Sequence, residues 1–580
     1  MNILGINSTY QEPSACFLKD GHIIAAVEEE RFNEVKHGKD SSAFGSWLLP
    51  FNAINYCLET ENITINEVEH ISYSFKPRIR LKRNIPYLLN CISVGKLNNV
   101  SKEVGYYYFN TRIPRFLLQF VPKQQSIRKN FIIQGKPQWD FHFVEHHIAH
   151  AASCFFVSPF EEAAILTIDG IGESTSTFLG LGTGNRIERL REFSYPNSLG
   201  LFYEEITRFL GFERSNDEHK IMALAAYGRP KYFNNLNKLI VLKPDGKYKI
   251  NIDFRKPSFL CLKELNDLLG PPRLWGAKID ERHIDIAASA QKILEETVLH
   301  ILKWLHHQTK TENLCMAGGV ALNCVLNERI RIESPFKNIF IQPAANDAGT
   351  SLGSALWVWH VILNHQERNI LDHIYLGPEI DGNQIEEALR FRKIPYIYFY
   401  NIAQKTAEEI CDGKIIGWIQ GKMEWGPRAL GNRSILADPR DPGIKSRLNN
   451  IKGREQFQPV APVILEEAVA DFFECNEPSP FMLFARRVRP EKKNVIPGAV
   501  HVDGTARIQT VNKTQNPLLY ELIREFEKLT GICLLVNTSL NAKAKPIVCF
   551  IDQVLDCFYN TPIDCLVIGH YFIEKGLMHK

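Results

Sequence analysis

Residues 2–31, NILGINSTYQEPSACFLKDGHIIAAVEEER, are the stretch that decides the fold. Short apolar runs separated by turns predict three strands, at residues 2–6, 15–18 and 22–27. Asp20 and Gly21 favour a hairpin turn between the second and third strands, because both residues tolerate positive φ. The stretch therefore predicts a strand–turn–strand–hairpin–strand unit that leads into a charged segment.

The same pattern returns at residues 163–193, AAILTIDGIGESTSTFLGLGTGNRIERLREF. Strands are expected there at residues 163–168, 176–181 and 187–193. Two such units at the start of two similar halves indicate an internal duplication. The arrangement resembles actin, hexokinase and the heat-shock chaperone ATPases, in which two related α/β halves close on a phosphate. A chance pairing of two β-meanders is the alternative.

Length and composition are those of a globular enzyme. The 580 residues correspond to about four average domains. Hydrophobic residues make up 45% and charged residues 23%, which excludes disorder, collagen and coiled coil as descriptions of the whole chain. The thirteen cysteines include no C-x-x-C pair and are expected to be reduced and buried. With no signal peptide and no run of about 18 apolar residues, a cytoplasmic protein without a membrane span is expected.

Residues 76–136 carry a strong local charge that the whole-chain value of +3 conceals. Thirteen basic residues and one acid, Glu103, give this segment a net charge of +12, so the rest of the chain sums to −9. Because aromatic residues are interleaved with the cations, a small helical core under a basic surface is one explanation. The other is an insert that binds an anionic, partly apolar acceptor, such as a phosphorylated, nucleotide-linked or lipid-linked sugar. No RNA-binding motif accompanies the segment, so a nucleic-acid partner is not expected.

A glycine turn and a compositional boundary organise the second half of the chain. A strand at 313–316 runs into AGGVALN at 317–323, where Gly318 and Gly319 can expose N–H groups to an anion at the start of a helix. A tight packing turn is the alternative. Residues 364–382 mix charge, Gly and Pro, which indicates a boundary. We therefore expect two domains, at residues 1–370 and 371–580.

One candidate metal centre is visible in the sequence. His146 and His150 are four residues apart, so on a helix their rings share one face. Asp169 and Asp347 each follow a predicted strand and lie beside glycine, and in a duplicated fold such strand ends meet across the cleft. Two imidazoles and two carboxylates would bind one divalent ion and leave positions open for a phosphate. Helix-surface histidines and carboxylates that cap turns are the alternative.

A second group of candidate residues lies in the second domain. Cations stand among Gly, Pro, Asn and Ser in GPRALG at 426–431, KGRE at 452–455, DGTAR at 503–507 and VNTSLN at 536–541. Arginine offers bidentate contacts and lysine a point charge, so these turns suit a small oxyanion that is held and activated. Solvated surface arginines are the alternative reading.

These motifs, in this order, resemble one family. They are EEERF at 28–32 with KHG at 36–38, HHIAHAA at 146–152, IDG at 168–170, KIMALAAYG at 220–228, and the segments 317–323, 426–431 and 537–541. The chain is similar to the O-carbamoyltransferases of the nodulation-protein U and cephamycin carbamoyltransferase type, with a layout like that of tobramycin carbamoyltransferase. The resemblance covers nearly the whole chain.

The resemblance implies a fold and a reaction. The expected fold is α/β: a duplicated actin-like (ASKHA) N-terminal domain, similar to the tRNA threonylcarbamoyl transferases, and a YrdC-like C-terminal domain. In such enzymes the YrdC-like domain joins carbamate from carbamoyl phosphate to ATP, which gives carbamoyl-adenylate and pyrophosphate. The N-terminal domain moves the carbamoyl group to a hydroxyl of a sugar-containing or other natural product. A divalent metal, iron by resemblance, holds the adenylate, and magnesium can accompany ATP. An actin-like small-molecule kinase or ATPase is the alternative function.

The resemblance also implies roles for individual residues. The expected metal ligands are His146, His150, Asp169 and Asp347. The expected catalytic residues are Glu12, Lys36, Arg428 and Lys452. The expected cofactor-binding residues are Gly170, Lys220, Gly318, Gly319, Asn323, Arg428, Lys452, Arg507, Asn537 and Ser539. The acceptor and the oligomeric state, for which a dimer is one option, stay open.

The chain departs from the family pattern at three places. Gln11 follows the first strand where the family usually has His, so Glu12 or His37 is the candidate to take the acceptor's proton. Gln458 replaces an arginine of the family motif Arg-Pro-Phe-Ala-Pro. Ala544 and Lys545 replace a Gly-Glu pair, so Lys545 is a candidate to restore the lost charge. These changes leave the class intact and put the use of the carbamoyl donor in question.

Overall fold

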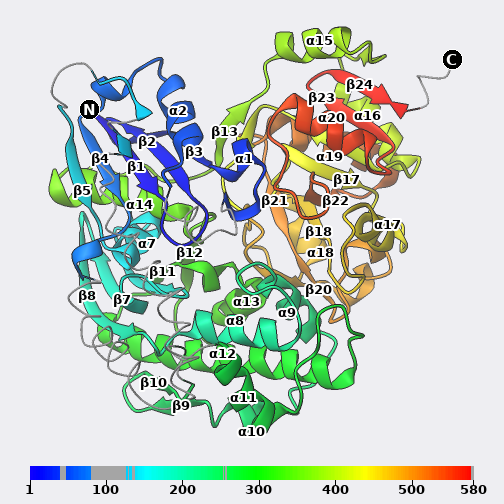
Figure 1. Cartoon of the computed structure of the whole chain (residues 1–580). Coiled ribbons are helices and arrows are strands. Elements are labelled where there is room, and N and C mark those ends of the chain that lie inside the picture. Colours follow the sequence, from blue (N-terminus) through cyan, green and yellow to red (C-terminus); the bar gives the residue numbers. More distant parts are fainter. Residues whose placement is uncertain are drawn as a thin grey trace. The chain divides into compact units, whose positions relative to one another are not determined.

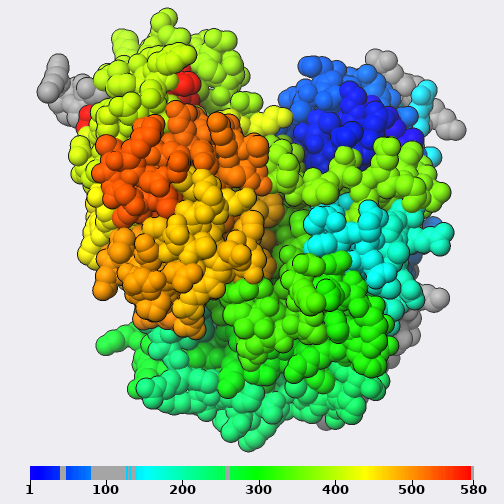
Figure 2. All heavy atoms as spheres, turned by 180° about the vertical axis from the view of Figure 1, so that it is seen from behind, coloured from blue at the N-terminus to red at the C-terminus, as the bar shows by residue number. Residues whose placement is uncertain are grey.

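The computed structural model describes residues 1–38, 48–79, 126–127, 130–133, 138–252, 254 and 258–575. The chain divides into two compact units. Unit 1 comprises Met1–Glu30 and His37–Leu371, and unit 2 comprises Arg31–Lys36 and Asp372–Lys580. Most of the basic segment 76–136 lies outside the described residues. On the face that the space-filling view shows, the described residues from 372 to 575 form one continuous body (Figure 2).

The first sheet of unit 1 has the strand order β3-β2-β1-β4-β5. Its strands are β1 (Asn2–Asn7), β2 (Ser14–Lys19), β3 (His22–Glu28), β4 (His70–Tyr73) and β5 (Asp140–Phe143). β1 pairs antiparallel with β2 and parallel with β4; β2 and β3 are antiparallel, and β4 and β5 are parallel. The central β1 is apolar on both faces, and its residues Ile3, Leu4 and Ile6 have no exposed surface. Strands β2 and β4 flank it, and the helix Gly349–Trp357 packs on it.

The second sheet of unit 1 repeats this topology with the order β8-β7-β6-β11-β12. Its strands are β6 (Glu162–Ile168), β7 (Thr175–Thr183), β8 (Arg186–Ser194), β11 (Asn313–Ala317) and β12 (Asn338–Ile341). Again the first three strands are antiparallel neighbours, and β6, β11 and β12 run parallel. Two sheets with one strand order and one set of strand directions confirm the predicted duplication and the actin-like α/β class.

Two helices lie between the sheets. Helix α14 (Gly349–Trp357) packs on β1, β2 and β4, whereas α7 (His146–Phe155) packs on β6, β7 and β11, and the two helices pack on each other (Figure 1). Their approach is close at Gly353, where an added Cβ would lie 1.7 Å from the carbonyl oxygen of Ala149. Only glycine permits this spacing, which sets the distance between the two helices.

The remaining elements of unit 1 surround this core. Its other helices are α1 (Glu30–Asn33), whose last residues belong to unit 2, α2 (Phe51–Glu59), α8 (Leu199–Phe209), α9 (Glu218–Ala225), α10 (Phe233–Leu236), α11 (Ser258–Leu269), α12 (Glu281–Thr309) and α13 (Cys324–Glu333), with the hairpin β9 (Ile240–Lys243) and β10 (Lys247–Ile250). The glycine turn at 318–319 does not enter α13 directly, because a 3-10 turn (Gly319–Leu322) intervenes. The predicted order of strand, glycine turn and helix is present, with this 3-10 turn as an additional element.

Unit 2 contains an eight-stranded mixed sheet with the order β14-β24-β23-β15-β17-β22-β18-β21. These strands are β14 (Ile397–Tyr398), β15 (Ile416–Ile419), β17 (Arg433–Ala437), β18 (Ala461–Leu465), β21 (Gln509–Val511), β22 (Leu534–Ser539), β23 (Cys565–Ile568) and β24 (Tyr571–Glu574). Two short pairs, β13 (Tyr375–Glu379) with β16 (Lys422–Glu424) and β19 (Ala485–Arg487) with β20 (Thr505–Arg507), stand beside it. The helices are α15 (Gly382–Phe391), α16 (Ile402–Cys411), α17 (Ile444–Ile451), α18 (Val469–Phe472), α19 (Pro517–Thr530) and α20 (Ile551–Tyr559).

Two further expectations concern cysteines and membranes. Every cysteine that the structure describes is a free thiol, and most are buried. Among the described helices, none combines the length and apolar character that crossing a bilayer requires.

Candidate functional site

The structure brings the four predicted metal ligands of unit 1 together. His146 and His150 lie one turn apart on α7 with no exposed surface, Asp169 follows β6, and Asp347 precedes α14. One ligand atom from each lies within 4.8 Å of the others. His146 Nε2 is 3.4 Å from Asp169 Oδ2 and 3.3 Å from Asp347 Oδ1. His150 Nε2 is 4.0 Å and 3.5 Å from the same two oxygens.

Backbone N–H groups orient both carboxylates. Gln11 N–H donates to Asp347 Oδ2 at 3.1 Å, and Gly319 N–H donates to Asp169 Oδ1 at 3.2 Å. The second oxygen of each carboxylate is therefore turned toward the two imidazoles. The Gly319 amide, which the sequence suggested for a substrate anion, thus serves Asp169 in this structure.

The charges of this cluster depend on one another. Burial opposes a charge on His146, but Asp347 and Asp169 hold its pKa well above the ordinary value. Although burial disfavours its ionised form, the two imidazoles hold the pKa of Asp347 well below its usual range. His150 Nε2 is buried and has no hydrogen-bond partner among the described residues. Because buried polar atoms are nearly always satisfied, an imidazole nitrogen of this kind facing two carboxylates is suited to be a ligand of a divalent cation.

A second cluster lies beside Gln11. Glu12 Oε1 is 2.8 Å from His37 Nδ1, and His37 Nε2 is 2.8 Å from Asn216 Oδ1. Burial raises the pKa of Glu12 although His37 opposes this. Burial also disfavours a charged His37, yet its hydrogen bond to Glu12 raises the pKa of the imidazole to about 9. The Glu12–His37–Asn216 chain is an acid–base group within unit 1; His37 had only a minor place in the sequence prediction and Asn216 none.

The other predicted residues of unit 1 contact protein groups. Asn323 Oδ1 accepts from Leu326 N–H and so caps α13. The carbonyl of Gly170 accepts from Ser198 Oγ at 2.6 Å. Lys220 pairs with Asp217 at 3.1 Å. Gly318 adopts φ +91°, and a Cβ there would lie 2.3 Å from Ile168 O, so its turn also needs glycine for packing.

In unit 2, Lys452 is the centre of a group of cations. Its side chain is buried, and Nζ donates to Ser539 O at 2.7 Å, Ser539 Oγ at 2.9 Å and Asn541 Oδ1 at 2.5 Å. Burial, Arg454 and Lys36 hold the pKa of Lys452 well below its ordinary value. Lysine with neutral partners and cationic neighbours is poised to receive an anion.

Arg507 and Asn537 belong to the surroundings of this group. Burial and the nearby Arg507 lower the pKa of Arg454 to about 10. Asn537 Nδ2 donates to Gln509 Oε1 at 2.7 Å, and to the carbonyl of Ala429, next to Arg428, at 3.4 Å. The predicted residues of the second domain thus lie around the loop 426–431 and the end of β22.

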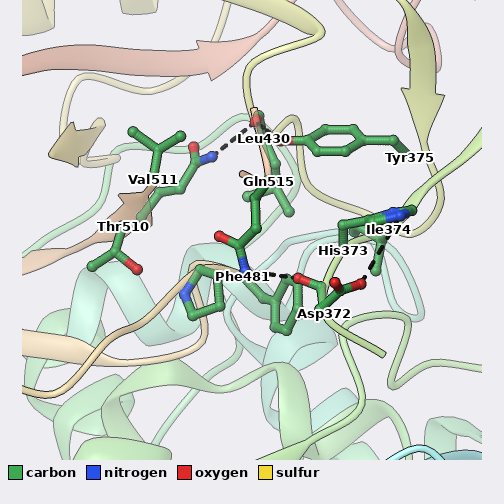
Figure 3. Close-up of a pocket in the computed structure, with 11 residues that line it drawn as sticks. Asp372, His373, Ile374, Tyr375, Leu430, Phe481, Thr510, Val511 and Gln515 are labelled. Atoms are coloured by element: carbon green, nitrogen blue, oxygen red, sulfur yellow. Dashed lines mark hydrogen bonds and ion pairs between the residues drawn. The ribbon is translucent and has the colours of Figure 1, made fainter. Parts of the chain in front are cut away.

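Loop 426–431 is fixed at its C-terminal end by the carboxylate of Glu424 and by hydrogen bonds from Tyr375 and Gln509. Glu424 Oε1 accepts from the N–H groups of Leu430 at 2.7 Å, Asn432 at 2.7 Å and Arg433 at 3.2 Å. The carbonyl of Leu430 accepts from Tyr375 Oη at 2.9 Å and from Gln509 Nε2 at 2.8 Å. Figure 3 shows Tyr375 directed at Leu430 beside a small cavity. Short-range sequence motifs do not reveal the supports from Tyr375 and Gln509, since both residues are far from Leu430 in the chain.

Lys545, the candidate to restore the lost positive charge, contacts two carboxylates. Lys545 Nζ pairs with Glu34 at 3.1 Å and with Asp556 at 3.4 Å, so carboxylates already balance its charge. Gln458 is buried and donates to Glu455 Oε2 at 2.7 Å. The amide of Gln458 is therefore satisfied locally, and the role of Lys545 stays a prediction.

The chain thus combines a cluster of metal-type ligands between the two sheets of unit 1 with a second α/β unit in which cations surround the buried Lys452, and both features are typical of enzymes. Two family models match the chain: Carbamoyltransferase N-terminus at residues 2–356 and Carbamoyltransferase C-terminus at residues 407–575. The chain belongs to the carbamoyltransferase family and is an enzyme that transfers carbamoyl groups.

Proteins similar to this chain include curated relatives and a solved structure. The chain is 39% identical to Uncharacterized protein sll1178 of Synechocystis sp. over 99% of this chain and 97% of that protein. It is 36% identical to Nodulation protein NolNO of Sinorhizobium fredii over 99% of this chain and 80% of that protein. A solved structure of full-length HypF, in a phosphate- and nucleotide-bound form, covers 63% of this chain and 47% of its own at 15% identity and a TM-score of 0.32. At these values the last similarity does not extend to function.

Proposed function

We propose that this carbamoyltransferase is ATP-dependent and divides two half-reactions between its units. In unit 2, water releases carbamate and phosphate from carbamoyl phosphate. The carbamate oxygen then bonds to the α-phosphorus of ATP, and carbamoyl-adenylate and pyrophosphate result. In unit 1, the acceptor's hydroxyl oxygen attacks the carbamoyl carbon, the bond to AMP breaks, and the hydroxyl proton passes to a base. The products are the O-carbamoylated acceptor and AMP.

The observation that carries this proposal is the positive charge around Lys452. Its hydrogen bonds go to neutral oxygens of Ser539 and Asn541, and Arg454 and Lys36 act on it electrostatically. Burying such charge is costly unless an anion compensates it. Joining carbamate to ATP brings two anions together, which needs concentrated positive charge of this kind. Arg428, on loop 426–431, is the further cation that would contact the phosphates.

Unit 1 supports the transfer step. His146, His150, Asp169 and Asp347 would hold a divalent metal, which when bound supplies positive charge beside the departing AMP. By family resemblance that metal is iron. Glu12 would accept the hydroxyl proton while His37 holds its carboxylate in place through their 2.8 Å contact.

The acceptor is proposed from charge alone. Clustered cations in residues 76–136 suit an anionic, partly apolar hydroxylated natural product, because they raise its local concentration at low salt. A nucleic acid is not the acceptor in this proposal.

Acceptor-free pyrophosphate release tests the division of labour. The parent enzyme should form pyrophosphate from ATP only when carbamoyl phosphate is present. Arg428→Ala and Lys452→Ala should each reduce that rate at least about 100-fold. His146→Ala should keep pyrophosphate release and lose bound metal and transfer.

The controls are matched by residue type. Lys528→Ala removes an exposed lysine of α19, and His307→Ala removes an exposed histidine of α12; both should behave like the parent. Formation of ADP without pyrophosphate would establish the kinase alternative. Loss of the same step in His146→Ala and Arg428→Ala would contradict the two-site assignment.

A further inference from the structure

The motif EEERF and the residues after it form a short excursion of the chain. Glu30 and His37 belong to unit 1, whereas Arg31–Lys36 belong to unit 2. The base of the excursion is closed by a hydrogen bond of 2.6 Å from His37 N–H to Glu30 Oε2. We call residues 31–36 the N-terminal strap.

Four contacts anchor the strap in unit 2. Arg31 Nη2 donates to the carbonyl of Gly426 at 2.9 Å, and the carbonyl of Arg31 accepts from Gln553 Nε2 at 3.1 Å. The Phe32 and Phe550 rings are 5.6 Å apart between centroids. Glu34 pairs with Lys545. These contacts run along the strap, which therefore has a defined course rather than a single point of attachment.

The Arg31 contact falls on the loop that bears Arg428. Arg31 is only 2% exposed, so its charge-assisted hydrogen bond to Gly426 is shielded from water. Gly426 has φ +110°, a conformation that side-chain-bearing residues rarely adopt, and because this residue is buried, its carbonyl needs a partner. At the other end of the loop, Glu424, Tyr375 and Gln509 hold Leu430. Arg31 thus closes a clamp that grips both ends of loop 426–431.

We propose that Arg31 is a positioning residue for Arg428: by holding the carbonyl of Gly426, it sets the geometry of loop 426–431 for the anionic substrates of unit 2. The site in unit 2 is accordingly built from two parts of the sequence, the strap and residues 372–580. The strap supplies Arg31 to the loop and Lys36 to the electrostatic surroundings of Lys452. The expected effect on pyrophosphate release rests on the proposed function, whereas the role of Arg31 in holding loop 426–431 does not depend on it.

The neighbouring Glu29 offers a matched control. Its carboxylate accepts from Asn52 Nδ2 at 2.6 Å and from Ala53 N–H at 2.9 Å, so it faces the start of α2 in unit 1. A change at Glu29 tests the fold around the same motif without touching loop 426–431.

The test compares Arg31→Met, Arg31→Lys and Glu29→Gln in the full chain. Hydrogen exchange read by mass spectrometry should show faster exchange of the amides of residues 430–433 in Arg31→Met, and unchanged exchange there in Glu29→Gln. In acceptor-free pyrophosphate release, Arg31→Met should lower kcat about 100-fold and change the KM for carbamoyl phosphate much less. Arg31→Lys should recover at least about tenfold of this loss, because its ammonium group can still donate to a carbonyl.

Each outcome decides the matter. Parent-like exchange at residues 430–433 in Arg31→Met overturns the positioning role, whether or not the enzyme forms pyrophosphate. A parent enzyme that releases no pyrophosphate refutes the proposed function, and the exchange experiment still judges Arg31. Faster exchange with unchanged kcat in Arg31→Met also overturns the proposal, since the geometry of the loop would then not matter for the reaction. An equal loss of kcat in Glu29→Gln overturns it too, since the motif would then act through general folding.

Discussion

Replacing Gly353 by alanine should separate the metal ligands of unit 1 without altering any of them. In the structure an added Cβ would lie 1.7 Å from Ala149 O, 2.7 Å from Ala149 C and 2.9 Å from Ser153 N. All three are backbone atoms of α7, so no side chain can rotate away. To reach even 3.0 Å from Ala149 O, α7 and α14 must move apart by about 1.3 Å.

This displacement is large for a metal centre. Ala149 precedes His150 on α7, and Asp347 lies just before α14, so the movement falls on the contact between His150 Nε2 and Asp347 Oδ1. Coordination distances tolerate about 0.2 Å. We therefore expect Gly353→Ala to lose bound divalent metal, and overpacking to lower stability by about 3 kcal/mol.

Elemental analysis after dialysis and thermal unfolding by circular dichroism measure the two effects. Gly382→Ala is the control, because nothing lies within 4 Å of its added Cβ at the start of α15. Acceptor-free pyrophosphate release should persist in both variants, since unit 2 is unchanged. Full metal content at parent stability in Gly353→Ala would refute the packing argument, whereas a metal-free parent would refute the metal site itself.

Three other perturbations have defined outcomes. Glu12 raises the pKa of His37 to about 9, above its ordinary value near 6.5. The stabilisation that protonated His37 contributes is therefore complete below about pH 6.5 and is lost as pH rises through about 9. Melting temperatures measured from pH 6 to 10 should show this fall, and the His37→Gln variant should show a smaller one. Arg433→Met removes the guanidinium that donates to the carbonyls of Pro378, Gln420, Gly421 and Asn432, and it should lower the free energy of unfolding by about 2 kcal/mol in chemical denaturation. Joint neutralisation of four residues of the basic segment, Arg78, Arg80, Lys82 and Arg83, should raise the acceptor KM at low salt and leave acceptor-free pyrophosphate release unchanged. Equal KM values for this variant and the parent, at low and at high salt, would contradict an acceptor-binding role.

The duplicated fold could be predicted because its signal is local. Apolar runs of strand length with Asp20-Gly21 or Gly184-Asn185 between them repeat at two places, and each run became a strand of one sheet. The sequence did not predict the 3-10 turn that lies between Gly318 and α13. Propensity does not distinguish one turn of 3-10 helix from the first turn of an α-helix, because both use the same φ/ψ region.

Residues of the candidate site could be predicted only where their side chains carry the donor atoms themselves. His146, His150, Asp169 and Asp347 carry donor atoms, so spacing and motif identify them. Backbone donors cannot be identified this way, since the amide of Gln11 that holds Asp347 would be present with almost any residue there. Long-range supports such as Tyr375, Gln509 or Arg31 depend on which distant segments meet.

The N-terminal strap also sets an order of events during synthesis. Arg31 leaves the ribosome early, but its partner Gly426 follows 395 residues later and Gln553 follows 522 residues later. At about 5–20 residues per second, roughly half a minute to two minutes pass before the strap can dock. Through that interval Arg31 and Phe32 cannot yet make these contacts, although all strands of the first sheet have been synthesised by residue 143. The strap is therefore among the last elements of this chain to reach its place, although it is among the first to be made.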